Sequence, residues 1–281
     1  MKNLKLFFGI AAMSAVLTIS CGPQLVEVSD LKLDKTTLEL IAGKTYTFTA
    51  TVLPDNATDK TVVWTSSDDN LASVENGIVT AKSNGTATIT ATAGTKINTC
   101  EVKVEGVLIN GIGWATCNVS TIGNFADVPG SGGAFFQWNR KRAWSDGSNS
   151  AAWDSSYPDG DTWDKANDPC PDGWRVPTIG ELKKLDEAEN VTSEWTAQNG
   201  TNGRKFTDNV THNSVFLPAP GYLHGNTSTK MNSTFYGYYW SSSVVNAGEN
   251  EAYNLLVYSS KVDSEEIHFK NYGLSVRCVA K

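Results

Sequence analysis

Two stretches of the chain alternate apolar and polar side chains with a period of two. In Thr45–Leu53 and in Thr86–Ala93, one face carries aromatic or aliphatic residues and the other carries threonine. A strand buried on one face has this period, so both stretches are predicted to be strands of an antiparallel sheet. Turn signals recur at Pro54-Asp55-Asn56, Asp68-Asp69-Asn70, Asn76-Gly77 and Asn84-Gly85. Their spacing predicts an all-β sandwich over residues 27–105.

The alternation weakens after residue 105, where Gly, Asn, Ser and Asp interrupt the chain throughout. Thr178 and Glu181 have the spacing of a capping box, which predicts a helix that continues to about Glu189. Leu182 and Leu185 would share the core face of that helix. Apolar runs predict strands at 215–217, 253–258 and 274–279. Regular structure is otherwise sparse in this pattern, so long loops are expected to dominate.

Amino-acid usage changes at the same place in the chain. Of the 28 aromatic residues, 23 lie in residues 106–281, and so do all five arginines. A length of 281 residues also favours two domains. We therefore expect one domain at 27–105 and a second at 106–281.

The N-terminus has the pattern of an export signal. Two lysines precede a fourteen-residue apolar run, residues 6–19, which is too short to cross a bilayer and typical of a secretory signal. The run ends in Leu-Thr-Ile-Ser-Cys-Gly, residues 17–22, which resembles the lipobox of bacterial lipoproteins. The resemblance implies a signal peptide at 1–20, lipidation of Cys21, a lipidated linker at 21–26 and anchoring at the outer membrane, on the cell surface. An ordinary signal peptide with a chance cysteine is the alternative.

Charge and motifs narrow the function classes. The chain has 30 Asp and Glu against 23 Lys and Arg, a net charge of −7. A protein that binds duplex nucleic acid needs a basic surface, so no nucleic-acid partner is expected. The chain lacks a serine-nucleophile elbow, a phosphate-binding loop, a zinc-protease motif and a dinucleotide fingerprint. The cysteine and histidine spacing of a zinc site is missing as well. We expect no enzyme activity, no metal and no cofactor.

Residues 27–105 resemble a known family. The segments that carry the resemblance are LELIAGKTYTFTATVLPDNAT, VVWTSSDDNLASVENGIVTAKSNGTATITATA and CEVKVEG, in that order. They are similar to the group 2 bacterial immunoglobulin-like domain, whose members serve mostly as spacer or adhesive modules without catalysis. Trp64 is then expected in the core.

Residues 106–281 resemble a second family. The motifs are GWATCNV, FFQWN, DPCPDGWRVPTIGEL, FLPAPGY, YYWSSS and GLSVRCV. Together they are similar to the Fibrobacter major paralogous domain, common in Bacteroidetes-type lipoproteins and related to C-type-lectin-like folds and to formylglycine-generating sulfatase-modifying enzymes. The resemblance implies an α+β C-type-lectin-like domain rich in long loops. It also implies core packing for Trp114, Trp174 and Trp240.

The same resemblance implies how two of the cysteines pair. In lectin-like folds, a cysteine beside the helix bonds one on the last strand, which implies a disulfide between Cys170 and Cys278. Export makes such oxidation chemically possible. Cys100 and Cys117 lie on either side of the domain boundary and either form a second bridge or stay free.

The stretch from Arg142 to Asp168 holds the candidate binding residues, because aromatic and acidic side chains alternate there without a helical or strand period. Aromatic faces stack on sugars or cover protein hot spots, and carboxylates accept hydroxyl hydrogen bonds. The candidate ligand-binding residues are Trp144, Trp153, Asp154, Tyr157 and Trp163. The alternative is that these tryptophans hold the loop onto its own domain. The acidic spacing is not that of an EF-hand calcium loop.

The leading hypothesis is a non-enzymatic surface lipoprotein that presents a lectin-like domain for cell adhesion. Its partners would be the membrane, through the lipid anchor, and a glycan or protein ligand on a host or neighbouring cell. A place at the tip of a surface filament is compatible with this role. The alternatives are an accessory enzyme related to sulfatase-modifying proteins and a structural envelope protein without a ligand.

Overall fold

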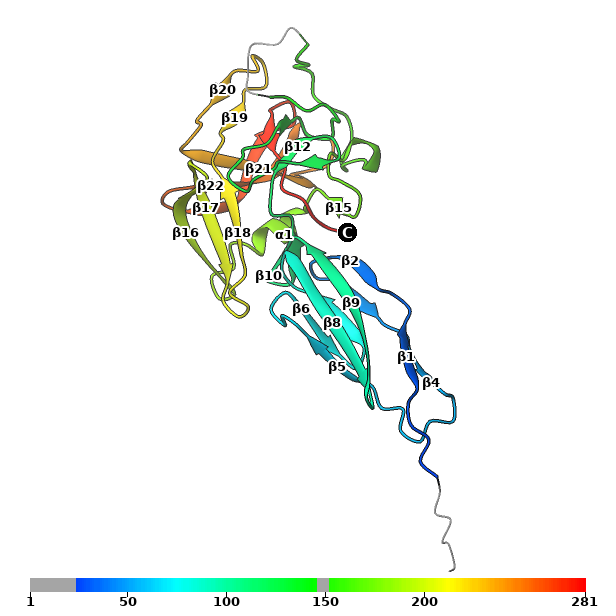
Figure 1. Cartoon of the computed structure of the whole chain (residues 1–281). Helices are drawn as coiled ribbons and strands as arrows, with labels where there is room; N and C mark the ends of the chain where they lie inside the picture. Colours follow the sequence, from blue (N-terminus) through cyan, green and yellow to red (C-terminus); the bar gives the residue numbers. More distant parts are fainter. Residues whose placement is uncertain (1–23, 146–151) are drawn as a thin grey trace, which may run out of the picture.

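The computed structural model describes residues 24–145 and 152–281. They form two β-rich bodies joined end to end (Figure 1). The first body contains nine strands. These are β1 (Asp30–Leu33), β2 (Thr37–Ile41), β3 (Thr45–Thr47), β4 (Ala50–Leu53), β5 (Val63–Ser66), β6 (Ala72–Glu75), β7 (Ile78–Ala81), β8 (Gly85–Ala93) and β9 (Lys96–Glu105).

The strands of the first body form three sheets, ordered β2-β9-β8-β5, β3-β7-β6 and β1-β4. β2 runs parallel to β9 over five residue pairs, from Thr37–Glu101 to Ile41–Glu105. Side chains from the two larger sheets meet in one buried cluster that includes Val79, Ile89 and Val102. The all-β prediction for this part of the chain is confirmed by these sheets.

The predicted strand at Thr45–Leu53 is divided between two sheets. β3 pairs with β7 and β4 pairs with β1, so the chain changes sheets at Phe48. Phe48 is buried and its ring stacks on Trp64 with a centroid distance of 5.5 Å. The second predicted strand, Thr86–Ala93, is confirmed within β8, where the alanines and Ile89 are buried.

The second body contains sixteen strands and two short helices among its described residues. The strands are β10 (Val107–Ile109), β11 (Ile112–Trp114), β12 (Val119–Thr121), β13 (Asn124–Phe125), β14 (Phe135–Phe136), β15 (Trp174–Arg175), β16 (Val191–Gln198), β17 (Thr201–Asp208), β18 (Ser214–Pro218), β19 (Tyr222–Leu223), β20 (Lys230–Met231), β21 (Tyr236–Val244), β22 (Glu251–Tyr258), β23 (Val262–Phe269), β24 (Leu274–Ser275) and β25 (Val279–Ala280). The helices are α1 (Ile179–Lys183) and a 3₁₀ turn at Lys165–Asn167.

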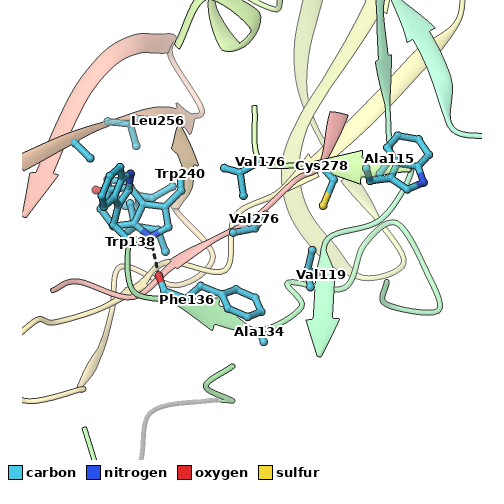
Figure 2. Close-up of a cluster of buried hydrophobic side chains, with 14 residues drawn as sticks. Ala115, Val119, Ala134, Phe136, Trp138, Val176, Trp240, Leu256, Val276 and Cys278 are labelled. Atoms are coloured by element: carbon cyan, nitrogen blue, oxygen red, sulfur yellow. Dashed lines mark hydrogen bonds between the residues drawn. The ribbon is translucent and has the colours of Figure 1, made fainter. Parts of the chain in front are cut away.

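The central sheet of the second body has the order β14-β24-β21-β22-β23 and separates two cores. Tyr239 and Val257 face one core, and Trp240 and Leu256 face the other. Figure 2 shows the second core, where the Trp240 indole N–H donates to the Phe136 carbonyl oxygen at 2.6 Å. The remaining sheets are β10-β11-β25-β15, β16-β17-β18, β12-β13 and β19-β20. The predicted core positions of Trp114, Trp174 and Trp240 are confirmed by their burial.

The prediction of an α+β C-type-lectin-like domain rich in long loops is wrong. The described part of residues 106–281 is nearly all β, with a single five-residue α-helix. Several strands were missed because apolar and polar residues do not alternate strictly along them, as in β16 and β17. The two-residue turn between them, Asn199-Gly200, has positive φ at both positions (50° and 79°), which matches the hairpin preference of this dipeptide. That signal in the sequence predicts the hairpin and was overlooked.

The capping box that begins α1 is confirmed. The Thr178 side chain accepts the Glu181 N–H, and the Glu181 carboxylate accepts the Thr178 N–H. The helix ends at Lys183, well before the predicted end at Glu189. Three acidic residues follow at 186, 187 and 189, and negative charge at a helix C-terminus opposes the helix dipole.

One glycine, Gly106, separates β9 from β10 and joins the two bodies. Its φ is +84°, and a Cβ there would lie 2.4 Å from the Trp174 ring. The Leu108 N–H donates to the Lys82 carbonyl oxygen at 2.8 Å, and Ile41 packs against the core of the second body. The two bodies are therefore joined by a packed and hydrogen-bonded junction.

Candidate functional site

Aromatic side chains form a continuous row on the second body. In order of ring contact, this aromatic row consists of Tyr258, Tyr236, Tyr238, Tyr222, His268, Tyr272, Phe269 and Tyr157. Successive ring centroids are between 5.1 and 6.2 Å apart. All of these side chains except Tyr238 are half-buried or exposed, so the row offers ring surface to solvent.

Strand register places the rings of the row together. β21 pairs with β22 so that Tyr236 is directly opposite Tyr258. Because side chains alternate along a strand, Tyr236 and Tyr238 share one face and Tyr239 points to the other. There the Tyr239 hydroxyl donates to the Pro218 carbonyl oxygen inside the buried core. One face of β21 therefore contributes tyrosines to the aromatic row, and Tyr239 on its other face packs in the core.

Two glycines allow β19 to approach β21. Gly221 has a φ of +80°, and a Cβ there would lie 2.0 Å from the Met231 carbonyl oxygen. A Cβ at Gly237 would lie 2.5 Å from a backbone carbonyl oxygen. The two glycines form an isolated parallel bridge. The close approach brings Tyr222 edge-on against Tyr238, with ring centroids 5.1 Å apart.

A pocket of about 280 Å³ lies at the Tyr258 end of the row. It is lined by four aromatic residues, Trp195, Phe235, Tyr236 and Tyr258, and by the polar residues Asn202, Thr234 and Ser259. Phe235 is 68% exposed, which is high for a side chain of this size. The Arg204 guanidinium donates to the Tyr258 carbonyl oxygen at 2.9 Å and so holds β17 beside the end of β22. The pocket combines ring faces with polar hydrogen-bonding side chains.

Burial keeps the middle of the row uncharged. It lowers the pKa of His268 to about 4 and raises the pKa of Tyr238 to about 12, because in each case the charged form would lose its hydration. The Asn254 amide nitrogen lies 3.4 Å from His268 Nδ1. Burial also raises the pKa of the Glu266 carboxyl, two residues before His268. At neutral pH the imidazole and phenol are neutral, which suits contact with an uncharged ligand.

The structure brings one of the five predicted binding residues, Tyr157, to the aromatic row, where its exposed ring lies 5.9 Å from Phe269. Trp144 is buried against Phe135, and its ring centroid is 4.9 Å from that of Trp153. The Trp153 indole N–H donates to the Gly225 carbonyl oxygen at 2.6 Å. The Trp163 indole N–H donates to the Asn167 carbonyl oxygen at 3.1 Å, and its ring packs against Trp138. Asp154 pairs with Arg140 at 2.5 Å.

Buried polar side chains hold the described part of this loop. Gln137 donates to the carbonyl oxygens of Asp154 and Asn271 at 2.6 and 2.8 Å. Asn271 in turn donates to the Ser155 carbonyl oxygen at 2.9 Å. The Lys270 ammonium donates to the Gly160 carbonyl oxygen at 2.9 Å and lies over the Trp138 ring. The loop is thus fastened along its backbone as well as through its tryptophans.

The row was missed from the sequence because its members come from separate strands and turns. Two of them, Tyr236 and Tyr238, carry a signal that could have been used. The segment YGYYW alternates as a strand does, which places both tyrosines on one face. The partners Tyr222, Tyr258 and His268 follow only from strand pairing, which the sequence alone does not give.

Residues 107–280 match the family described as the Fibrobacter succinogenes major domain. The chain belongs to this family. In front of the Fibrobacter succinogenes major domain, residues 27–104 match the group 2 bacterial Ig-like domain.

Curated relatives share short segments with this chain. Kappa-carrageenase of Pseudoalteromonas carrageenovora is 43% identical over 72 residues, which are 25% of this chain and 18% of that enzyme. An Ig-like virion protein of Serratia phage KSP90 is 39% identical over 95 residues, 32% of this chain and 36% of that protein. An alpha-L-arabinofuranosidase of Bifidobacterium longum subsp. longum is 45% identical over 71 residues, 25% of this chain and 7% of the enzyme. The chain spans less than two fifths of each.

Two solved structures of the S-layer protein SbsC are also similar to parts of this chain. Domains 4 and 5 are 26% identical over 29% of this chain and 53% of theirs, with a TM-score of 0.25. Domains 4–9 are 15% identical over 89% of this chain and 31% of theirs, with a TM-score of 0.26.

The Fibrobacter succinogenes major domain contains a disulfide between Cys170 and Cys278. Cys100 and Cys117 are buried free thiols. The two arginines that lie near the disulfide cysteines are held by protein acceptors. Arg175 pairs with Glu181 at 2.5 Å, and the buried Arg277 donates to the carbonyl oxygens of Ala115 and Thr116.

The predicted signal peptide at 1–20 and the predicted lipidation site at Cys21 lie outside the described residues. Within the described ranges, no helix is long and apolar enough to span a bilayer. The same ranges contain no group of three or more His, Cys, Asp or Glu side chains arranged to hold a metal ion.

Proposed function

We propose that this protein is a non-enzymatic, surface-exposed lipoprotein of the outer membrane that binds a glycan through its aromatic row and the adjoining pocket. The lipid on Cys21 would anchor it. The Ig-like domain would act as a spacer between the anchor and the binding domain. The observation that carries the proposal is the run of ring contacts from Tyr258 to Tyr157, with a ring-lined pocket at one end.

The chemistry of the pocket favours a sugar. Aromatic rings present a broad apolar face, which packs against the C–H face of a pyranose, and polar side chains at the rim exchange hydrogen bonds with its hydroxyls. Asn202, Thr234 and Ser259 supply such groups beside the four rings. The pocket volume of about 280 Å³ lies just below the range of roughly 300–1,000 Å³ for drug-sized ligands, which suits one sugar unit of a longer chain.

The row extends this site beyond one sugar unit. Tyr222, Tyr272 and Phe269 continue the ring surface away from the pocket. Successive rings at such spacing offer repeated stacking positions for an extended oligosaccharide. The neutral state of His268 removes a charge that would otherwise require hydration within this surface.

One observation weighs against catalysis, and the similar enzymes give no support for it. Cys278, the cysteine that an enzyme related to sulfatase-modifying proteins would need in the C-terminal third, is bonded to Cys170. Three of the similar proteins are glycosidases, but this chain covers only 18%, 5% and 7% of their lengths, so their activity does not transfer. We therefore propose binding without turnover.

The test is a glycan array probed with the mature chain and with the variants Trp195→Ala and Phe235→Ala. Loss of a hot-spot aromatic costs about 2 kcal/mol, so each variant should bind its glycan about thirtyfold more weakly. Tyr253→Ala is the control, because this half-buried tyrosine lies on β22 but outside the row. Melting temperatures should stay close to that of the wild type for Phe235→Ala, whose ring is exposed.

Two results would contradict the proposal. If no glycan binds and the chain instead captures a protein ligand, the ligand class is wrong. If a glycan binds with equal affinity to all variants, the site is wrong. The absence of any ligand would favour a purely structural role in the envelope.

A further inference from the structure

The end of the Ig-like domain that lies away from the second body carries exposed apolar side chains. Leu25 is 76% exposed, Ile97 65% and Val63 57%. Val63 and Ile97 both pair with Thr92, one from each side, so they stand in one row across β5, β8 and β9. Three large aliphatic side chains are thus left in water at one end of a small domain, where burial would be favourable.

A shallow apolar hollow of about 250 Å³ lies at the same end. Its walls come from residues 25–28, from Thr58 and Asp59, and from the tip of the β8–β9 hairpin at Gly94 and Thr95. The Thr58 N–H donates to the Val26 carbonyl oxygen at 2.9 Å, which fixes the entering chain against the domain. Figure 1 shows this end at the bottom of the molecule, with the second body at the other end.

Covalent geometry limits the distance between Leu25 and the proposed lipid anchor at Cys21. Gly22, Pro23 and Gln24 are the residues between Cys21 and Leu25. Four residue steps span at most about 14 Å when fully extended. If Cys21 carries lipid, Leu25 and the hollow beside it are therefore confined to the immediate neighbourhood of the bilayer surface.

We infer that this end of the Ig-like domain is a membrane-contact face, which rests on the bilayer and holds the domain at a set orientation. It combines Leu25 and the hollow, on the side of β8 where Val28 packs, with Val63 and Ile97 on the other side of the strand. The inference rests on the anchoring part of the proposed function. Its occupant is the lipid surface, because the short linker holds this end within about 14 Å of the lipid on Cys21. Partly buried apolar side chains at the interface add to the binding that lipid chains supply.

Charge at this end predicts which lipids are needed. Glu27 and Asp59 offset Lys60 and Lys96 around the hollow, so the face has no excess of positive charge. Attraction to anionic lipids requires such an excess. The contact should therefore form on neutral phosphatidylcholine and should not weaken in high salt.

The test uses the mature, lipidated chain in phosphatidylcholine vesicles that carry a spin-labelled lipid as quencher. Thr95→Cys places a fluorophore at the exposed hairpin tip, and Val210→Cys places one in the second body, where Val210 is 84% exposed. Cys100 and Cys117 are buried, so the reagent should modify the new thiol. Quenching should be several-fold stronger at position 95 than at position 210.

A second part of the experiment distinguishes quenching caused by apolar contact with the bilayer from quenching caused by the lipid tether alone. In the labelled Thr95→Cys chain, the double change Val63→Asp and Ile97→Asp should reduce quenching toward the level seen at position 210. Val210→Asp, made in the same background, should leave it unchanged. Both aspartates are introduced at exposed positions, so the fold should persist, which circular dichroism would check.

The outcomes distinguish this inference from the proposed anchor. If the lipidated wild type does not float with vesicles any better than Cys21→Ala, the anchor and this contact are both overturned. If it floats but positions 95 and 210 are quenched equally, or if the two aspartates change nothing, the contact face alone is overturned. If the fluorophore at position 95 is protected from a soluble quencher as strongly without vesicles as with them, and the chain forms dimers, the contact face would be assigned to a second copy instead.

Discussion

At the scale of single residues, His268 has the most unusual environment. Rings of Tyr222, Tyr238 and Tyr272 surround it within 5.4 Å between centroids. These rings give no opposite charge to stabilise an imidazolium, so burial lowers the pKa to about 4 from 6.5. The native state thus holds His268 neutral, whereas the unfolded chain protonates it near pH 6.5.

This difference predicts a loss of stability in acid. Between pH 6.5 and 4 the unfolded state binds more protons at this site, so the free energy of unfolding falls as pH is lowered through that window and this contribution levels off below it. The loss should be about 2–3 kcal/mol by pH 4.5. Urea unfolding of wild type and His268→Gln at pH 7.5 and 4.5 measures it. A wild type that loses no more stability than His268→Gln would contradict the assignment.

Residue-level patterns were predictable where the signal is local. The Thr178–Glu181 capping box depends on four consecutive residues and was found from the sequence. Trp114, Trp174 and Trp240 were placed in the core through motif resemblance and are buried. His268 and Tyr222 acquire their neighbours through pairing between distant strands, which no local pattern encodes.

At the scale of elements, the loop that follows β14 is fastened by its tryptophans. Trp144 → Ala would remove a buried ring that contacts Phe135 and Trp153. Large-to-small changes in a core cost about 3–5 kcal/mol, so its melting temperature should fall by several degrees or more. Tyr157→Ala, at an exposed ring in the same loop, should leave stability nearly unchanged. Calorimetry gives the melting temperature of both variants, and comparison with their glycan affinities distinguishes a structural role from ligand contact.

The opposite pattern would restore the original hypothesis for this loop. A Trp144→Ala or Trp163→Ala chain with wild-type stability and weakened binding would make these tryptophans ligand contacts. Weaker glycan binding by Tyr157→Ala at unchanged stability is expected in either case, because Tyr157 ends the aromatic row.

Elements were predictable from the sequence where alternation is strict. β8 was found because threonine and apolar residues alternate along it without interruption. β3 and β4 were merged into one strand, since the same alternation continues through Phe48 while the chain changes sheets. β23 was missed because it is the outer strand of its sheet and carries acidic residues at Asp263, Glu265 and Glu266.

At the scale of the whole molecule, the proposed anchor and the proposed binding site lie on different bodies. Gly106 joins those bodies directly, and the Leu108–Lys82 hydrogen bond crosses the junction. The distance between membrane and ligand is then set by folded structure and not by a flexible linker. The sequence predicted the order of the two domains but not this close junction, because the contacts of Gly106 with Trp174 form only after folding.

The parallel pairing of β2 with β9 has a mechanical consequence for a protein held at both ends. Tension would pull the start of β2 toward the membrane and the end of β9 toward the ligand. The five residue pairs from Thr37–Glu101 to Ile41–Glu105 would then be loaded in shear, all at once. An antiparallel hairpin pulled at its open end instead separates one pair after another, as β8 and β9 would between Gly85 and Glu105. Single-molecule pulling through residues 25 and 281 should therefore need a higher force to rupture the Ig-like domain than pulling through 85 and 105, and equal forces would refute this. The domain would then transmit tension between anchor and ligand without unfolding and so resist detachment under flow.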